Sequence, residues 1–393
     1  MEKELKKIEN ALDNAIDWLI SSGIQNKKTK LKDSVNAWYD PIKKKYSFVY
    51  SEINGYFMTT MVFLYKKTGQ KKYLEFGLKS AKWLIKNAQD KNGGFKCLFV
   101  IDKNSKYSFK ENKIYSFDNG VILNGLVSLY KVSKKSILLK SAKKCADWII
   151  KYCMDGSSLV KPVYDIEDNK FFDSDKDWST TSGSYHTKIS IGLANLFTVT
   201  KKKIYLDSAK KICDKSLEFQ KSNGRFLSFP YKGGTNAHPH CYSAEGIWVL
   251  GKFLNKKKYL NSSKKAAKWI LSTQNHSGRI ARLFLLNTSV YHQRIDAVAQ
   301  AIRLAFIHNL ENKHNILKPK NKLNKLIKIL LKNQNLKTNN KKIKGSFIWG
   351  KNSDGSMVGH SNSWVTFFAI QALYLYQDLL KNKKIQLEEF DLI

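Results

Sequence analysis

Six times along the chain, a polar segment containing aromatic or histidine residues leads directly into an apolar helix-forming segment. The first is YSEINGYFMTTMVFLY, which begins at Tyr50, and the others begin at Tyr115, Gly183, His238, Tyr291 and Gly359. A helix that is apolar on all sides must be surrounded by other helices. The repeat therefore predicts six buried helices whose polar starts share one pocket.

Six amphipathic segments alternate with the buried ones. They cover residues 3–22 and then begin at Lys71, Ile137, Lys203, Lys257 and Leu317. Their apolar residues recur at spacings of three and four, which is typical of a helix with one buried face. The alternation predicts an all-α (α/α)6 toroid with an inner and an outer ring of six helices, in a single domain over residues 1–380 with a tail at 381–393. We expect the long, glycine-containing connections before the buried helices to form β-turns or small hairpins beside the polar starts.

The charge balance is strongly basic, with 69 basic and 32 acidic residues and a net charge of +37. Such a balance is compatible with nucleic-acid binding. However, the basic residues are nearly all lysine, and no zinc-finger spacing, glycine-rich phosphate loop or helix-turn-helix pattern accompanies them. Nucleic acid is therefore a disfavoured partner.

The cysteines and histidines do not indicate a metal site. The five cysteines are odd in number and lack metal-ligand spacing. The segment HPHC at 238–241 offers two histidines and a thiol, but close sequence neighbours rarely supply a full ligand set. We expect reduced cysteines, no bound metal and no cofactor.

The termini and turns bear on location. No run of about 18 apolar residues occurs, and the charged start MEKELKKIENALDN lacks the apolar core of a secretory signal, which predicts a cytoplasmic protein. The short turns after the buried segments would form a basic ring opposite the polar starts, from Lys66, Lys67, Lys71, Lys72, Lys134, Lys135, Lys201, Lys202, Lys203, Lys256, Lys257 and Lys258. This ring could dock on an anionic membrane surface, at about 1 kcal/mol per residue, or be a solvated rim, which is the simpler interpretation. Vesicle binding that weakens as salt is raised would favour the membrane.

The six polar starts supply side chains that can do chemistry. The candidate catalytic residues are Glu52, Asp118, Tyr185, His186, Tyr242, Glu245 and Asp296. The candidate substrate-binding residues are Tyr50, Tyr115, His238, His240, Arg282, Arg294, His360, Asn362 and Trp364. Any one of them alone could be an ordinary helix cap or a packing residue. The indication comes from their coincidence in six repeats, and the third, fourth and fifth repeats are the richest.

Arginine is rare in this chain, with five residues against 64 lysines. Four of the five, Arg282 and Arg294 among them, lie in segments that face the predicted pocket. A guanidinium group can hold a carboxylate or a sulfate through two parallel hydrogen bonds. This placement predicts an anionic oligo- or polysaccharide as the substrate.

The alternation of twelve helices, with aromatic and acidic residues at the inner starts, resembles the six-hairpin glycosidase superfamily of (α/α)6 toroids over nearly the whole chain. That superfamily includes glycoside hydrolases, unsaturated glucuronyl hydrolases, polysaccharide lyases and sugar epimerases. The segments FDNGVILNGLVSLY at Phe117 and SYHTKISIGLANL at Ser184 resemble, more narrowly, the C-terminal domain of D-glucuronyl C5-epimerases. The narrower resemblance implies that Tyr185 acts at the sugar. The chain departs from that family at Ile189, where the family has a second histidine, and in the two repeats that follow the motif.

Three functions remain open from the sequence. The first is epimerase or lyase chemistry at a uronate-containing glycan, with the base and acid drawn from Tyr185, His186 and Tyr242. The second is glycoside hydrolysis by two carboxylates drawn from Glu52, Asp118, Glu245 and Asp296. The third is non-catalytic binding of a glycan or of a lipid-linked intermediate.

Overall fold

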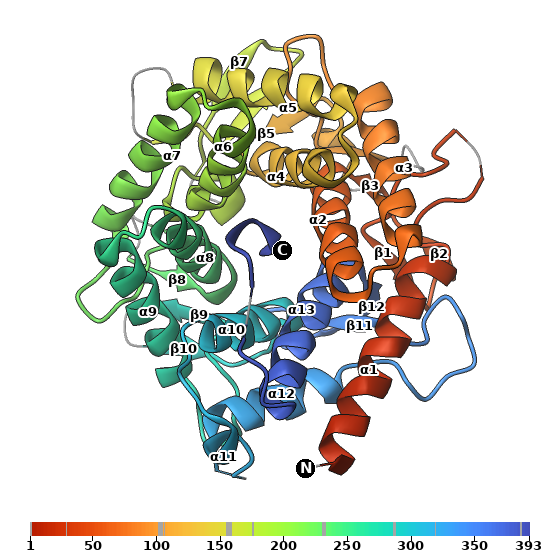
Figure 1. Ribbon diagram of the computed structural model, residues 1–393, viewed down its shortest axis with the longest axis vertical. Helices are drawn as coiled ribbons and strands as arrows, with labels where there is room; N and C mark the ends of the chain where they lie inside the picture. Colours follow the sequence, from red (N-terminus) through yellow and green to blue (C-terminus); the bar gives the residue numbers. More distant parts are fainter. Residues whose placement is uncertain are drawn as a thin grey trace.

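A computed structural model describes residues 2–28, 30–100, 105, 107–154, 159–174, 177–229, 233–285, 288–318, 320–385 and 387–393. Within these residues, six helices form an inner ring whose order follows the chain (Figure 1). They are α2 (Ser51–Thr68), α4 (Ser116–Ser133), α6 (Thr187–Thr200), α8 (Ala237–Phe253), α10 (Ile295–Ile307) and α13 (Ser363–Leu380). Most of their residues are buried, as their apolar composition predicts.

The outer helices each bury one face against the inner ring. They are α1 (Glu2–Ser21), α3 (Lys71–Asn87), α5 (Ser136–Trp148), α7 (Lys203–Ser216), α9 (Lys257–Ser272) and α12 (Lys322–Lys332). This arrangement confirms the predicted toroid. The last outer helix begins later than Leu317, because the side chain of Asn321 caps it by accepting hydrogen bonds from the backbone N–H groups of Leu323 and Asn324. A short helix, α11 (Lys313–Ile316), precedes it.

The two ends of the chain close the ring. Five hairpins consist of an inner helix and the outer helix that follows it, whereas the sixth pairs the last inner helix, α13, with the first helix, α1. Glu9 on α1 forms an ion pair with Lys381 (2.8 Å) and accepts a hydrogen bond from Gln377 (3.3 Å). The toroid is therefore complete only when helices from opposite ends of the chain meet.

Glycines allow neighbouring inner helices to approach closely. A Cβ atom at Gly120 would lie 2.6 Å from the Cα of Ile189, and one at Gly192 would lie 2.7 Å from the carbonyl oxygen of Gly120. Both distances are shorter than any real Cβ contact, so α4 and α6 can pack at this spacing only with glycine at these positions.

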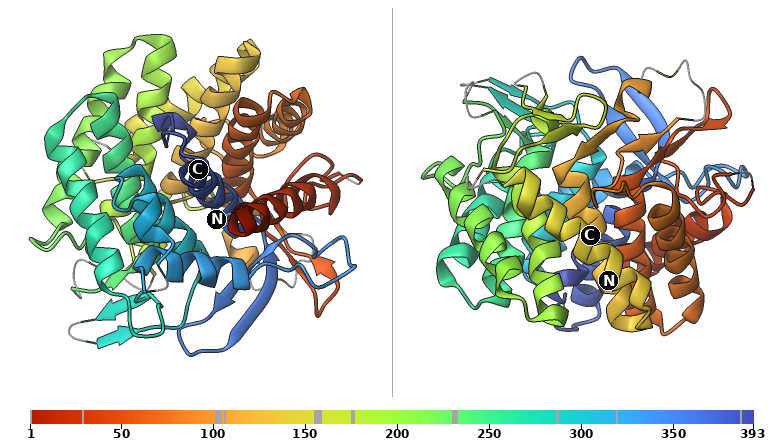
Figure 2. Two further views of the ribbon diagram at one scale, coloured as in Figure 1. Left: turned by 60° about the horizontal axis from the view of Figure 1, so that its bottom comes forward. Right: turned by 90° about the horizontal axis from the view of Figure 1, so that it is seen from above.

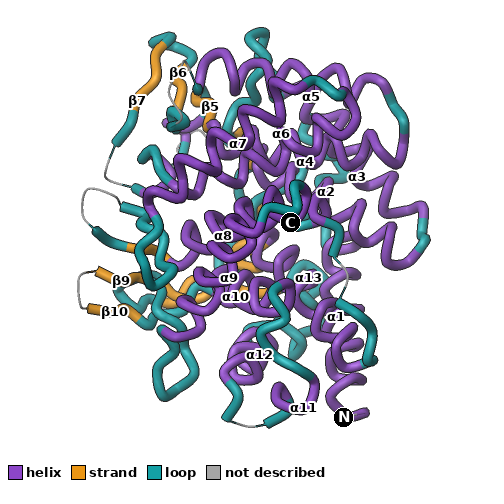
Figure 3. Tube along the Cα trace, turned by 60° about the vertical axis from the view of Figure 1, so that its left-hand side comes forward, coloured by secondary structure: helices purple, strands orange, loops and turns teal. Residues whose placement is uncertain are grey.

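Short antiparallel strands gather at the end of the ring where the inner helices begin (Figures 2 and 3). One sheet has the order β11 (Phe347–Lys351), β12 (Met357–Asn362), β1 (Trp38–Asp40) and β2 (Lys45–Tyr46). The others are β10 (Thr288–Val290) with β9 (Leu283–Leu285) and β8 (Thr235–Asn236), β5 (Lys113–Tyr115) with β6 (Val163–Asp165) and β7 (Lys170–Phe172), and β3 (Val49–Tyr50) with β4 (Leu98–Phe99). The predicted hairpins are thus confirmed. We call this end the mouth and the opposite end the closed face.

The C-terminal segment 387–393 turns back into the middle of the ring from the closed face (Figure 1). Ile393 is buried, and its main-chain oxygen accepts hydrogen bonds from Lys188 (3.1 Å) and Arg303 (2.6 Å). Along the same segment, Glu388 and Asp391 pair with Lys66 at 2.6 and 2.8 Å.

Acidic side chains on the closed face pair with two lysines of the predicted basic ring. Lys66 is paired with Glu388 and Asp391, and Lys67 is paired with Asp378 at 2.8 Å, so two members of the predicted ring are neutralised locally. Docking on an anionic membrane by the remaining lysines stays a prediction. Among the described residues, no helix is long and apolar enough to cross a bilayer. All five cysteines are buried.

Candidate active site

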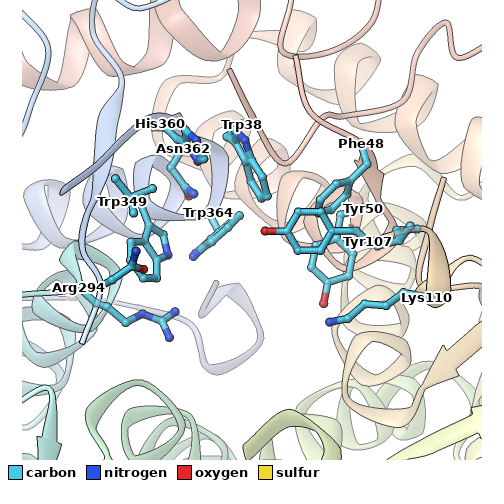
Figure 4. Close-up of a pocket in the computed structure, with 13 residues that line it drawn as sticks. Trp38, Phe48, Tyr50, Tyr107, Lys110, Arg294, Trp349, His360, Asn362 and Trp364 are labelled. Atoms are coloured by element: carbon cyan, nitrogen blue, oxygen red, sulfur yellow. The ribbon is translucent and has the colours of Figure 1, made fainter. Parts of the chain in front are cut away.

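Two connected cavities open at the mouth of the toroid. The inner cavity, of about 140 Å³, lies over the inner-helix starts and is lined by Tyr50, Glu52, Ile53, Tyr115, Phe117, Asp118, Trp178, Ser179, His238, Tyr242, Arg294 and Trp364. The outer cavity, of about 350 Å³, is lined by Trp38, Phe48, Tyr50, Leu98, Tyr107, Lys110, Arg294, Trp349, Asn352, Val358, His360, Asn362 and Trp364 (Figure 4). Tyr50, Arg294 and Trp364 line both, so the two cavities form one funnel.

Two acidic side chains face the inner cavity from neighbouring helices. Glu52 lies in the first turn of α2 and Asp118 in the first turn of α4. The Tyr50 hydroxyl donates to Oδ1 of Asp118 at 3.4 Å. The other oxygen, Oδ2, is buried and receives no hydrogen bond from any residue that the structure describes. A buried carboxyl oxygen without a partner indicates that a ligand or a proton completes the site.

Burial raises the pKa values of both acids. Desolvation raises the pKa of Glu52 from 4.5 to about 7, although Tyr50 and Lys110 oppose the shift. Burial raises the pKa of Asp118 well above its usual value, and the negative charge of Glu52 raises it further. Burial therefore favours the protonated form of both acids, and of Asp118 most strongly.

A third acid, Asp296 at the start of α10, is held in its ionised form. Burial alone would raise its pKa, but the charge of Arg294 keeps the pKa of Asp296 well below its usual range. The Arg294 guanidinium donates to both carboxylate oxygens, at 3.1 and 2.5 Å. The indole Nε1 of Trp364 donates to the same group at 3.0 Å. Asp296 is fully buried, and the side chains that reach the funnel are those of its partners, Arg294 and Trp364.

His238 and Tyr242, both on α8, supply neutral polar groups to the inner cavity. Burial lowers the pKa of His238 to about 3, against the opposing charge of Asp296. Its Nδ1 lies 2.6 Å from Oε1 of Gln300, which can only accept, so Nδ1 carries the proton and Nε2 is an acceptor. Burial also raises the pKa of Tyr242, so its phenol remains protonated.

Aromatic side chains and two cations form the outer cavity. Trp38 stacks on His360 with ring centres 5.0 Å apart and meets Trp364 edge-on at 6.1 Å. Lys110 and Arg294 extend toward the opening from opposite sides (Figure 4). Aromatic walls with a few placed charges are typical of binding pockets for small polar ligands.

Some predicted catalytic residues lie outside both cavities. Tyr185 packs behind Phe117 and Trp178 in a short 3-10 turn, Ser184–His186, that precedes α6. His186 lies beside the hydroxyl of Ser116 at 3.2 Å, and burial lowers its pKa to about 3. Glu245 is fully buried below the funnel, where it pairs with Lys188 at 2.8 Å and with Arg303. Catalytic roles for these three residues stay predictions that the geometry does not favour.

Some of the predicted substrate-binding residues line a cavity, and others do not. Tyr115 lines the inner cavity, and His360 and Asn362 line the outer one. Asn362 also caps α13, because its side chain accepts a hydrogen bond from the backbone N–H of Val365 at 3.1 Å. His240 is engaged within the core: Nδ1 accepts from the backbone N–H of Phe226, and Nε2 donates to the carbonyl of Ala266, both at 3.1 Å. Arg282 donates to the carbonyl of Lys351 and lies against Trp349, outside both linings.

Several residues that line the funnel were not predicted from the sequence: Trp38, Phe48, Tyr107, Lys110, Phe117, Trp178 and Trp349. All except Phe117 lie in the connections before the inner helices. Alternating aromatic and polar residues around Asp40-Pro41 and around Asn352 to Gly355 were the available signal for mouth hairpins. Metal ligands do not gather anywhere in the described part of the chain.

Comparison with known proteins finds one family model that matches part of the chain. The model of glycosyl hydrolase family 76 matches residues 82–244, a stretch that includes Asp118. An uncharacterized protein from Caenorhabditis elegans is 30% identical over 121 residues, which make up 30% of this chain and only 16% of that relative.

Solved structures show the fold more completely. Cellobiose 2-epimerase from Bacillus thermoamylovorans has a TM-score of 0.75 at 11% identity and matches 96% of this chain and 100% of that one. Unsaturated glucuronyl hydrolase from Bacillus sp. GL1 has a TM-score of 0.65 at 13% identity, over 95% of this chain and 98% of that one. A D-mannose isomerase has a TM-score of 0.69 at 11% identity, over 95% and 97%. The chain therefore has the (α/α)6 six-hairpin glycosidase-like fold.

Proposed function

Because the chain has the fold of six-hairpin glycosidases, we propose that it is a glycoside hydrolase in which Asp118 and Glu52 act on a sugar bound in the inner cavity. The observation that carries this proposal is the pair of carboxyl groups in one buried cavity, one of which has an oxygen that no described residue satisfies. Glycosidases use two such groups, an acid that protonates the leaving oxygen and a carboxylate that activates water or attacks the sugar.

The environments of the two acids assign their roles. Asp118, which keeps its proton, donates it to the glycosidic oxygen as general acid. Glu52, which ionises near pH 7, acts as the base or the nucleophile. Asp296 is a positioning residue, since it holds Arg294 and Trp364 against the cavity. Tyr242 and His238 offer a hydrogen-bond donor and an acceptor to sugar hydroxyls.

The cations at the opening favour an anionic sugar, such as a uronate. Lys110 lines the outer cavity and forms no ion pair with the residues that the structure describes. The charge of Arg294 is shared with Asp296, so Lys110 is the more available cation. The similar glucuronyl hydrolase is described as responsible for the degradation of glycosaminoglycan, which also supports an anionic substrate.

The epimerase or lyase alternative draws its base and acid from Tyr185, His186 and Tyr242. Of these three, Tyr242 lines the inner cavity, and burial raises the pKa of its phenol, so the protonated phenol is a weak base. The Tyr185 hydroxyl is buried, lies outside both cavity linings and has no hydrogen-bond partner among the described residues. A base for proton removal from a uronate must reach the sugar directly or through one water. The carboxyl pair therefore supports hydrolysis better.

The two reactions can be distinguished on the purified protein. Uronate-terminated and neutral disaccharides would be incubated in heavy water, with reducing ends and C5 deuterium measured together. We expect reducing ends from the uronate-terminated substrate, no deuterium at C5 and no unsaturated uronate. Reducing ends that appear together with an unsaturated uronate would indicate a lyase. Deuterium without reducing ends would contradict the hydrolase and support the epimerase, and the absence of both would support a binding protein.

The carboxyl pair predicts opposite pH trends in activity and stability. Activity should rise as pH increases through about 7, because Glu52 must ionise to act. Stability should fall over the same window: between pH 4.5 and about 7 the folded protein binds more protons at Glu52 than the unfolded chain does. The melting temperature should therefore drop by on the order of a few degrees across it. Glu52→Gln should flatten this drop, and an unchanged slope in that variant would contradict the assignment.

A further inference from the structure

A large groove adjoins the funnel at the mouth. Its volume is about 1330 Å³, several times that of the outer cavity. Its walls come from the end of α1 and the loop that follows, from the β1–β2 hairpin, and from the loop around Tyr107. The first group includes Lys27 and Lys28, and the hairpin supplies Lys43 and Lys45. The proposed hydrolysis does not involve this groove.

The charge along the groove is mainly positive. Lys27, Lys28, Lys43, Lys45 and Lys342 line it, whereas Asp40 is the acidic residue among the lining residues. Asp40 is already engaged: its Oδ1 accepts from the backbone N–H groups of Ile42 and Lys43, and its Oδ2 lies 3.5 Å from Nε2 of His360. A concave surface with one sign of charge concentrates ligands of the opposite sign.

The groove is continuous with the funnel. Trp38, Phe48, Tyr107 and His360 line both the groove and the outer cavity. The stacked rings of Trp38 and His360 lie at this shared border, 5.0 Å apart and nearly parallel. A chain that leaves the outer cavity can pass over these rings into the groove.

We propose that the groove binds the rest of a polyanionic polysaccharide whose terminal sugar occupies the inner cavity. The inference rests on the proposed function and adds the length and charge of the substrate. The lysines contact carboxylate or sulfate groups spaced along the polymer, and the aromatic residues contact the sugar faces. A neutral glycan or a single charged sugar would leave most of these lysines unused.

The test compares ligand length and charge in two matched triple variants. Lys27→Gln, Lys28→Gln and Lys43→Gln together remove three exposed charges from the groove. Lys135→Gln, Lys202→Gln and Lys257→Gln together remove three exposed charges from the closed face, so both variants have the same net charge. Both sets are placed in an Asp118→Asn background to prevent turnover. Affinity is measured for oligogalacturonates, which carry carboxylates, and for chondroitin oligosaccharides, which also carry sulfates, each as a disaccharide and as a decasaccharide.

We expect decasaccharides to bind more tightly than disaccharides, and the groove variant to lose roughly tenfold in decasaccharide affinity while disaccharide affinity changes little. The closed-face variant should keep both affinities. Preference for one polymer type would identify carboxylate or sulfate as the group recognised. Equal losses in both variants, no dependence on length, or equal binding of a neutral mannan decasaccharide would overturn the proposal.

A single-stranded oligonucleotide provides a further arm. If it binds more tightly than every decasaccharide and only the groove variant loses this binding, the groove is a nucleic-acid site and the proposal is wrong. Recovery of the oligosaccharides intact after each binding measurement shows that no turnover occurred, so the result does not depend on whether Asp118 is the catalytic acid. Failure of the hydrolase assignment and failure of the groove assignment are therefore separate outcomes.

Discussion

Replacing Asp118 with asparagine is expected to reduce glycan hydrolysis by a factor of about a thousand, because the amide cannot protonate the leaving oxygen. The loss should appear in kcat rather than in KM, since an asparagine of the same shape still completes the cavity wall. The measurement is steady-state release of reducing ends from a uronate-terminated oligosaccharide. Burial disfavours the charged form of Asp118, which the unfolded chain adopts at neutral pH, so the neutral amide should not lower the melting temperature.

The matched control for this variant is Asp168→Asn. Asp168 lies in the turn between β6 and β7, with its side chain 56% exposed and paired with Lys170, and it lines neither cavity. Activity within about twofold of the unmodified protein is expected for it. If Asp118→Asn kept normal kcat, the catalytic role of this pair would be wrong. A large drop in melting temperature would instead indicate a structural role for Asp118.

Replacing Arg303 with methionine is expected to destabilise the fold by about 3–5 kcal/mol, the usual cost of removing one partner of a buried ion pair. Arg303 is fully buried on α10. Its guanidinium donates to Glu245, to Gln371 at 3.1 Å and to the main-chain oxygen of Ile393 at 2.6 Å. The substitution leaves Glu245 with Lys188 as its remaining cation and removes one of the two hydrogen bonds that the main-chain oxygen of Ile393 accepts.

Urea unfolding followed by tryptophan fluorescence would measure this loss. The control is Arg279→Met, which removes the same charge from an exposed turn at the mouth and should change stability by less than about 0.5 kcal/mol. A comparable loss in both variants would show that net charge, and not the buried contacts, determines the effect. A double variant with Glu245→Gln should be less destabilised than Arg303→Met alone, because no buried anion is then left short of a partner.

The same contacts explain why Glu245 and Asp296 looked catalytic from the sequence. Both belong to the polar segments that lead into buried helices, as do Glu52 and Asp118, but the structure places Glu245 in the middle of α8. What separates the two groups is whether a cation is paired with the acid. Arg303 and Lys188 neutralise Glu245, and Arg294 neutralises Asp296, whereas neither Glu52 nor Asp118 forms an ion pair with a cation among the described residues. Arg294 lies two residues from Asp296, but Lys188 and Arg303 come from α6 and α10, which the spacing along α8 does not reveal.

The positions of His238 and His240 in the fold could not be predicted from the sequence either. His238 and His240 are separated by one residue in HPHC, yet one lines the inner cavity and the other bonds to the backbone of the core. A difference of two positions rotates a side chain by about 200° around a helix, so the two side chains point to opposite sides of α8. The sequence did not state which side faced the cavity.

By itself, the sequence determined the toroid. Six apolar segments that need to be surrounded, and six amphipathic segments with one face to bury, have few arrangements other than two concentric rings. The placement of the polar starts at one mouth followed, because successive helices of a hairpin array run in opposite directions. Only the tertiary structure decided which polar residues became an active-site candidate, how α1 met α13, and where the groove lay. Those features depend on burial and on partners from distant segments, and both arise only when the ring has closed.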